Sequence, residues 1–165
     1  MTHDYNSSVI SLRPYRKEDF DELWSLDQEC FPPGIAYTRF ELGVYMRLPN
    51  GFALVAAEGQ RIAGFIVCDA RRKTGHVITI DVRQEARRRG VGSLLLGAAE
   101  RRLQEQGCTG LFLETAVDNA PALRFYERHG YSVLRTIPRY YMGTLDALRL
   151  GKNFSASEHR GASSE

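Results

Sequence analysis

The chain of 165 residues has few cysteines, no long apolar run and little net charge, and each shortage argues against a class of protein. Its three cysteines, Cys30, Cys68 and Cys108, are widely spaced and form no CxxC pair, which indicates reduced thiols rather than a disulfide framework or a zinc site. No stretch approaches the roughly 20 apolar residues that span a bilayer. The segment Met1–Ser8 is too polar for a signal peptide. We therefore expect a cytoplasmic protein without a membrane partner.

Positive and negative charges nearly cancel, because the chain has 22 Lys and Arg residues and 20 Asp and Glu residues, for a formal net charge of +2. Such a balance creates no overall field that attracts nucleic acid. Three local arginine clusters (71–73, 87–89 and 101–102) leave an RNA-binding protein as an alternative, but acidic residues interrupt them. We therefore expect no nucleic-acid partner.

The composition, 43% hydrophobic and 25% charged, is ordinary for one soluble domain with a single well-buried core. The periodicity of apolar residues predicts an α/β domain with a mixed sheet. The predicted strands are 9–15, 52–58, 61–71, 76–82, 109–115, 131–137 and 146–150, and the predicted helices are 16–29, 38–47, 90–106 and 119–130. Short turns between the second, third and fourth strands predict an antiparallel meander. The domain is predicted to span 9–152, between a flexible N-terminus (1–8) and a disordered tail (153–165).

Arginine and glycine dominate the segment Arg87–Ser93, between a predicted strand and a predicted helix. Glycine lets the backbone approach a ligand closely, and the free amides and dipole of a helix N-terminus favour an anion. Arg87, Arg88 and Arg89 add full positive charges with forked donors. The segment therefore predicts a phosphate site. No Lys follows the glycines, and GxG replaces GxGxxG, so the patterns of P-loops and of dinucleotide-binding domains fit poorly.

The motif Arg87-x-x-Gly90-x-Gly92 after Ile80-Asp81-Val82 resembles the acetyl-CoA motif of the GNAT superfamily, whose loop amides grip the CoA pyrophosphate. The segment Asn119–Tyr131 is similar to the second half of that signature. The resemblance covers roughly Val9 to Leu150. It implies the GNAT fold, an α/β structure with a mixed, mostly antiparallel central sheet flanked by helices. It also implies an N-acetyltransferase that uses acetyl-CoA as co-substrate and needs no metal. The cofactor-binding residues that it implies are Ile80, Asp81, Val82, Arg87, Arg88, Arg89, Gly90, Val91, Gly92, Ser93, Asn119 and Tyr126.

Acetyl transfer to an amine needs a base and an acid, and Glu114 and Tyr126 are the candidates. An α-amine has a pKa of about 8 and is largely protonated at neutral pH. Glu114 is expected to remove that proton, directly or through water. A backbone N–H near Val82 is expected to stabilise the oxyanion, and Tyr126 to protonate the leaving thiolate. The structural alternatives are a solvent-facing Glu, a core Tyr and, for Asn119, a helix N-cap.

Within the superfamily, the chain is most similar to the RimI-type enzymes, which acetylate protein N-terminal α-amines. The similarity lies in the spacing of Glu114 and Tyr126, in Cys30-Phe31-Pro32, and in Pro138-Arg139-Tyr140-Tyr141 after the predicted sixth strand. It implies direct attack by a peptide or protein N-terminus in a ternary complex. The implied acceptor-site residues are Phe31, Tyr37, Tyr140 and Tyr141.

Three departures from that group leave other acceptors and classes open. Arg87 replaces the usual Gln, Pro33 follows Pro32 in place of a Trp-containing stretch, and no Pro follows the tyrosine pair. A small-molecule amine is therefore an alternative acceptor, and a non-catalytic acyl-CoA-binding module is an alternative class. A route through an acetylated cysteine is less favoured, because Cys108 follows a helix C-terminus rather than preceding an N-terminus. Either a monomer or a homodimer is expected.

Overall fold

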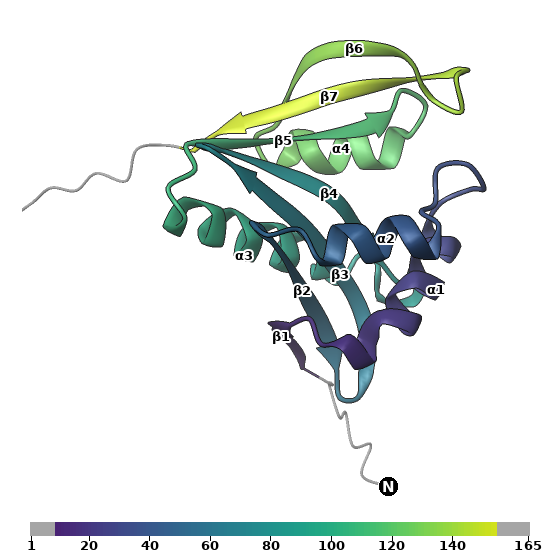
Figure 1. Cartoon of the computed structure of the whole chain (residues 1–165), viewed down its shortest axis with the longest axis vertical. Helices are drawn as coiled ribbons and strands as arrows, with labels where there is room; N and C mark the ends of the chain where they lie inside the picture. Colours follow the sequence, from purple (N-terminus) through teal and green to yellow (C-terminus); the bar gives the residue numbers. More distant parts are fainter. Residues whose placement is uncertain (1–8, 155–165) are drawn as a thin grey trace, which may run out of the picture.

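The computed structural model describes residues 9–154, which form one seven-stranded sheet with helices on both faces (Figure 1). The elements in chain order are β1 (Ile10–Pro14), η1 (Lys17–Asp19), α1 (Phe20–Cys30), α2 (Arg39–Met46), β2 (Gly51–Glu58), β3 (Arg61–Arg71), β4 (Thr74–Val82), η2 (Gln84–Ala86), α3 (Val91–Glu105), β5 (Gly110–Ala116), α4 (Ala120–Arg128), β6 (Ser132–Tyr141) and β7 (Leu145–Asn153), where η marks a 3-10 turn. The strand order is β1-β2-β3-β4-β5-β7-β6. Only β4 and β5 run parallel, which confirms the predicted mixed, mostly antiparallel sheet.

The sixth strand is longer than predicted. β6 continues to Tyr141, so the Pro138–Tyr141 segment lies inside the strand rather than after it. A strand at the edge of a sheet tolerates proline, because one side of its backbone needs no partner. The pairing of β6 with β7 is irregular between Ile137 and Tyr141, and this irregularity accommodates Pro138.

The last strand also extends beyond its predicted end. β7 reaches Asn153, and the backbone N–H of Phe154 donates to the Thr109 carbonyl oxygen at 2.8 Å. The domain therefore includes two residues that were assigned to the tail. The predicted flexible segment 1–8 and the remainder of the predicted tail lie outside the described residues.

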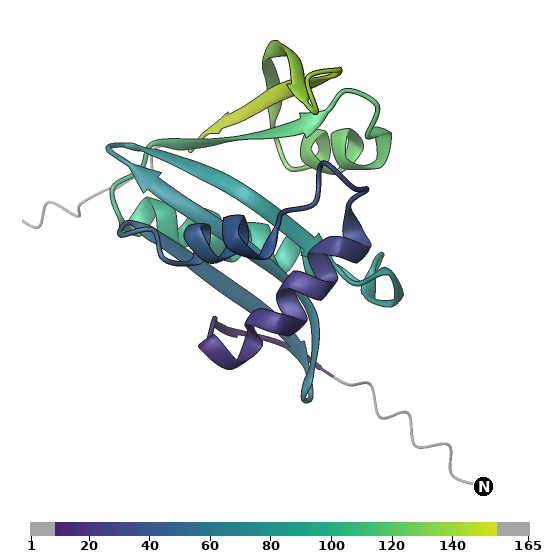
Figure 2. The same ribbon diagram turned by 45° about the vertical axis from the view of Figure 1, so that its right-hand side comes forward.

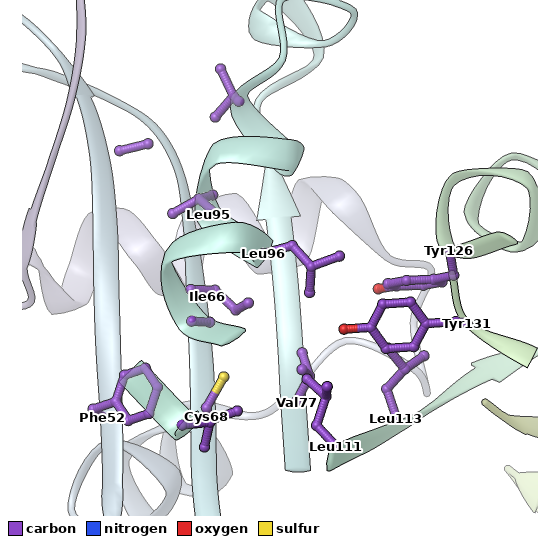
Figure 3. Close-up of a cluster of buried hydrophobic side chains, with 14 of the residues drawn as sticks. Phe52, Ile66, Cys68, Val77, Leu95, Leu96, Leu111, Leu113, Tyr126 and Tyr131 are labelled. Atoms are coloured by element: carbon purple, nitrogen blue, oxygen red, sulfur yellow. The ribbon is translucent and has the colours of Figure 1, made fainter. Parts of the chain in front are cut away.

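Each face of the sheet carries its own apolar core. On one face, α3 and α4 pack on the sheet through the cluster drawn in Figure 3, where Tyr126 and Tyr131 project toward Leu96 of α3. On the other face, α1 and α2 cover a second cluster that includes Leu23, Leu42 and Phe65. Side chains alternate between the faces along a strand, so neighbouring residues of β4 or β5 serve different sides of the molecule.

The strands β4 and β5 are hydrogen-bonded over a short length. Their parallel pairing joins Thr74–His76 to Gly110–Phe112, and beyond these residues the two strands diverge, as Figures 1 and 2 both show. β4 also has a bulge, because Val77 and Thr79 pair with consecutive residues of β3 and leave Ile78 without a partner. The divergence divides the sheet into two arms, and the candidate functional residues lie around the opening between them.

The helix α3 offers a direct test of this packing. Leu95 is fully buried against the sheet, whereas the adjacent Leu94 is 45% exposed. We expect Leu95→Ala to lower the free energy of unfolding by about 2–5 kcal/mol, because it leaves a cavity in the core. Leu94→Ala, the matched control, should change it by less than about 0.5 kcal/mol. Urea denaturation followed by circular dichroism measures both, and equal losses would contradict the assignment of helix faces.

Candidate functional site

The segment 87–93 makes a tight turn into the N-terminus of α3. Gly90 caps the helix with a positive φ of 79°, and a Cβ placed there would meet open space. The first helical hydrogen bond runs from Leu94 N–H to the Gly90 carbonyl oxygen. The amides of residues 91–93 therefore have no partner inside the helix and carry the positive end of its dipole. This arrangement fits a phosphate or pyrophosphate group, as the sequence predicts.

The three arginines of this loop differ in their surroundings. Arg89 makes a two-pronged ion pair with Glu58 at 2.9 and 3.0 Å. Arg87 turns back and donates through Nε to the Val82 carbonyl oxygen at 3.1 Å. Arg88, whose φ is 62°, makes no ion pair or side-chain hydrogen bond within residues 9–154. Arg88 is therefore the loop arginine with the most freedom to contact an anion.

Helix α4 packs against this loop. The Phe125 ring lies so close to Gly92 that a Cβ there would come within 3.2 Å of it. One residue after Gly92 and four residues after Phe125, the Ser93 hydroxyl and His129 Nε2 are 2.9 Å apart. His129 Nδ1 donates to the Phe125 carbonyl oxygen at 2.7 Å, which leaves Nε2 to accept from Ser93. The segment 87–93, called the phosphate loop below, is thus in contact with α4, the helix that carries Tyr126.

Tyr126 belongs to the core on the α3 face and is 6% exposed. Burial, followed by the nearby charge of Asp81, raises the pKa of its hydroxyl, which therefore stays protonated. The hydroxyl makes no hydrogen bond within residues 9–154 and can donate to a ligand. Asn119 starts the same helix, and its side chain accepts from Ala122 N–H at 3.3 Å, so its predicted N-cap role is confirmed.

The end of β4 presents its three predicted cofactor residues to different surroundings. Ile80 and Val82 pack against the core on the α3 face. The side chain of Asp81 is 1% exposed and accepts from the Thr79 hydroxyl at 2.6 Å. The carboxyl group of Asp27 on α1 lies near it and raises its pKa, so only the backbone of Asp81 is free to face a ligand.

Asp27 and Asp81 form a buried carboxyl pair. Asp27 is fully buried and accepts from Tyr37 N–H at 2.7 Å. The remaining oxygens, Asp27 Oδ1 and Asp81 Oδ2, meet no N–H or hydroxyl donor within residues 9–154. A proton held between the two carboxyl groups satisfies both. Burial raises the pKa of each group, and the charge of Asp27 raises that of Asp81 further.

Glu114 lies on the opposite face of β5 from the buried Leu113, and its side chain is 7% exposed. Arg149 of β7 donates to Oε1 through Nε at 3.1 Å and Nη2 at 2.8 Å. His76 of β4 places Nε2 2.7 Å from Oε2. Burial alone would raise the pKa of Glu114, but the hydrogen bonds and charges of His76 and Arg149 outweigh it, and the pKa is lowered. Glu114 is therefore an ionised carboxylate with both oxygens engaged.

Phe112 completes this group on the same face of the sheet. His76 stacks on its ring at a centroid distance of 4.4 Å and an interplanar angle of 9°. The Arg149 guanidinium lies 4.8 Å from the centroid of the same ring. Sequence reasoning missed His76 and Arg149, which lie 38 and 35 residues from Glu114. The only sequence signal for His76 was its place at the start of a predicted strand that is rich in β-branched residues.

The predicted acceptor tyrosines lie close to Glu114. After burial, the charge of Glu114 contributes to raising the pKa of both Tyr140 and Tyr141. The rings of these two residues pack edge to face at 4.9 Å. Tyr37 packs against Tyr45 of α2, and its hydroxyl donates to the Ile78 carbonyl oxygen at 3.2 Å. The structure thus places Tyr140 and Tyr141 near the ionised Glu114, and Tyr37 near these two tyrosines.

Phe31, the fourth predicted acceptor residue, lies apart from these rings. It caps the C-terminal end of α1, is half-buried, and makes no ring-to-ring contact within the described part of the chain. The loop that follows it does reach the acceptor side. Gly34 lies so close to Met142 that a Cβ there would overlap the Met142 sulfur. The α1–α2 loop and the β6–β7 turn are therefore in contact.

The thiols are in environments that oppose nucleophilic activation. Burial raises the pKa of Cys30 to about 11, and burial also raises the pKa of Cys68 and Cys108. All three cysteines are free. Among residues 9–154 no group of three or more His, Cys, Asp or Glu side chains could hold a metal ion. In the same part of the chain no helix has the length and apolar character needed to cross a membrane.

Comparison with known proteins adds to this geometry. Residues 19–131 match the acetyltransferase (GNAT) family. An uncharacterized N-acetyltransferase of Methanocaldococcus jannaschii is 31% identical over 142 residues, which is 86% of this chain and 90% of that protein. N-alpha-acetyltransferase 30 of Schizosaccharomyces pombe is 27% identical over 146 residues, covering 86% and 96%. The fold is similar to that of the ribosomal-protein-S18-alanine N-acetyltransferase of Escherichia coli, with a TM-score of 0.81, 18% identity and coverage of 92% and 98%.

The pair Asp27–Asp81 predicts a pH-dependent stability. A raised carboxyl pKa means that stability is fully present below the unfolded value of about 3.9 and is lost as pH rises through the folded value. Asp81→Asn can donate to Asp27 without a shared proton, so the fall in melting temperature between pH 5 and pH 9 should become smaller. Asp21→Asn, at an exposed position of α1, is the control. If the melting temperature falls equally with pH in wild type and in Asp81→Asn, the idea of a shared proton is contradicted.

Proposed function

Because this chain belongs to the acetyltransferase (GNAT) family, we propose that it transfers the acetyl group of acetyl-CoA to the α-amine at a peptide or protein N-terminus. Membership of that family makes the chain an acetyl-CoA-dependent N-acetyltransferase. The α-amine acceptor rests on relatives such as the Schizosaccharomyces pombe N-alpha-acetyltransferase, which aligns with 86% of the chain. A RimI-like preference is part of the same proposal.

The observation that carries the proposal is the division of the chemical groups between the two faces of the sheet, at the opening between β4 and β5. The phosphate loop and Tyr126 belong to the α3 face. Glu114 and the tyrosines near it belong to the opposite face. A donor bound at the loop and an amine held near Glu114 would therefore approach the opening from different sides, as direct transfer in a ternary complex requires.

The residues of the chain divide the proton transfers between them. The ionised Glu114 centre draws a proton from the ammonium group of the acceptor, which frees the nitrogen lone pair for attack on the acetyl carbon. Backbone amides of β4 near Val82 are proposed to stabilise the oxyanion. As the C–S bond breaks, the protonated hydroxyl of Tyr126 donates to the leaving thiolate. High thiol pKa values argue against a route through an acetylated cysteine.

The acceptor site is proposed to lie among Tyr37, Tyr140 and Tyr141, with Phe31 at its margin. Aromatic walls bind a peptide chain through apolar contact and leave their hydroxyl groups to bond its backbone. An ionised carboxylate at the base of such a site attracts the positively charged end of the chain. We also propose a cytoplasmic protein that acts as a monomer or a homodimer and has no nucleic-acid or membrane partner.

The acceptor class can be tested with matched peptides. Release of free CoA thiol from acetyl-CoA is measured with a short peptide that has a free N-terminus and no Lys. The comparison substrates are the same peptide with a formylated N-terminus, a formylated peptide that contains Lys, and a panel of small amines. We expect turnover only of the free α-amine. Turnover of small amines alone would favour the small-molecule alternative, and binding of CoA without any turnover would favour a non-catalytic module.

Tyr126→Phe tests the acid. The change removes the hydroxyl and keeps the ring packing, so we expect kcat with the free-N-terminus peptide to fall about 10²-fold while the melting temperature changes little. Tyr131→Phe is the matched control, because its hydroxyl bonds Glu100 at 2.8 Å in the same core. That variant should lose stability and keep its kcat. Equal kcat values for Tyr126→Phe and wild type would remove Tyr126 from the mechanism.

A further inference from the structure

We propose that His76 is the group that takes the proton from the acceptor amine, through its Nδ1 atom, and that Glu114 acts by positioning and polarising His76. This inference rests on the proposed function and deepens it by assigning the proton-accepting atom. The sequence pointed to Glu114 as the base. The contacts of the described residues instead favour His76, which is hydrogen-bonded to Glu114.

The hydrogen bonds of Glu114 leave it poorly suited to accept a proton from the substrate itself. The two donors of Arg149 occupy Oε1, and His76 occupies Oε2. Only 7% of the Glu114 side chain is exposed, whereas 32% of the His76 side chain is. A proton placed on Glu114 would also cost the charge that balances Arg149.

The hydrogen bond between the two side chains fixes the tautomer of His76. An ionised carboxylate only accepts, so Nε2 must carry the hydrogen that bridges the 2.7 Å to Glu114 Oε2. In the neutral ring the lone pair is then on Nδ1, which makes no hydrogen bond within residues 9–154. A carboxylate that holds one nitrogen of an imidazole while the other takes a proton is the arrangement of a catalytic dyad.

The surroundings of His76 favour a ring that gains and loses a proton in place. Phe112 of β5 holds the ring flat by stacking. The charged groups that face it are Glu114 of β5 and, beyond that residue, Arg149 of β7. On β3 the register partner of His76 is Asp69, which is itself paired with Arg71 at 3.0 Å. Glu114 is the charge in direct contact with the ring.

In the proposed step, His76 takes one proton from the substrate and the acetyl group moves from sulfur to nitrogen. The N–H bond of the substrate ammonium breaks, and a new N–H bond forms at Nδ1 of His76, which becomes an imidazolium ion paired with Glu114. The freed nitrogen lone pair forms the C–N bond, and the C–S bond of the donor breaks. The thiolate takes a proton from Tyr126, and the nitrogen loses its second proton as the amide forms. That second proton returns through solvent to the Tyr126 oxygen and restores the hydroxyl. His76 then passes its proton to solvent, so the net reaction releases one proton and one thiol.

The pH dependence of kcat distinguishes the two bases. In wild type, kcat with a saturating free-N-terminus peptide should rise with pH as the base loses its proton. His76→Gln keeps a donor for Glu114 but has no basic nitrogen, so kcat should fall about 10²-fold and the rising limb should disappear. Glu114→Gln keeps an acceptor for Nε2 and leaves the imidazole in place, so the rising limb of kcat should remain. Thr74→Ala, at an exposed position on the same strand, should match wild type.

A measurement without turnover tests the same geometry. Long-range ¹H–¹⁵N NMR spectra of the wild-type protein report which ring nitrogen of His76 carries hydrogen. We expect the Nε2–H tautomer near neutral pH, because Nε2 bridges to Glu114 Oε2. An Nδ1–H tautomer would overturn the assignment.

The outcomes separate the inference from the proposed function. If wild type turns over no peptide with a free N-terminus, the proposed acceptor class fails, whatever the variants do. If wild type is active and His76→Gln retains the rising limb while Glu114→Gln loses it, Glu114 is the base and the inference fails alone. A folded His76→Gln protein that binds CoA normally but lacks the limb supports the inference.

Discussion

The parallel pairing of β4 and β5 extends over three residue pairs and then stops, and the candidate functional residues lie around the place where it stops. Unpaired strand edges carry backbone groups that need other partners. The Ile78 carbonyl oxygen accepts from the Tyr37 hydroxyl, and the Val82 carbonyl oxygen accepts from Arg87 and from the Cys30 thiol. Side chains of α1, of the loop after it and of the phosphate loop thus satisfy two carbonyl groups of β4.

The alternation of side chains along β5 assigns the two halves of the chemistry to different sides of this opening. Leu113 faces α3 and α4, where the phosphate loop and Tyr126 lie, and Glu114 faces the acceptor side. Contacts between Gly92 and Phe125 and between Ser93 and His129 join the two helices that carry the donor side. One short strand therefore separates the proposed acid from the proposed base while it keeps both near the same gap.

Two buried acidic centres near the opening are stabilised in opposite ways. Glu114 remains charged because Arg149 and His76 compensate for its burial, and its pKa is lowered. Within residues 9–154 neither Asp27 nor Asp81 forms an ion pair, and burial raises the pKa of both. The first centre suits proton transfer, since Glu114 is charged and holds an imidazole ring by a hydrogen bond. The second joins α1 to β4 and suits a structural role at neutral pH.

The sequence by itself determined the order of the elements, the antiparallel meander and the phosphate loop, because these depend on local periodicity, turn residues and short-range spacing. It also identified Asn119 as a helix cap, which the structure confirms. It gave the wrong end for β6, since Pro138 reads as a strand terminator unless the strand is known to lie at an edge.

Only the tertiary structure decided which side chains meet. His76, Glu114 and Arg149 come from three strands, and their contact depends on the register of β4 with β5 and of β5 with β7. The pairing of Asp27 with Asp81 likewise depends on how α1 crosses the sheet. Such contacts join residues more than thirty positions apart, and no local pattern encodes them. The sequence therefore supplied the candidate acid and base, and the fold supplied the partners that determine the charge of each.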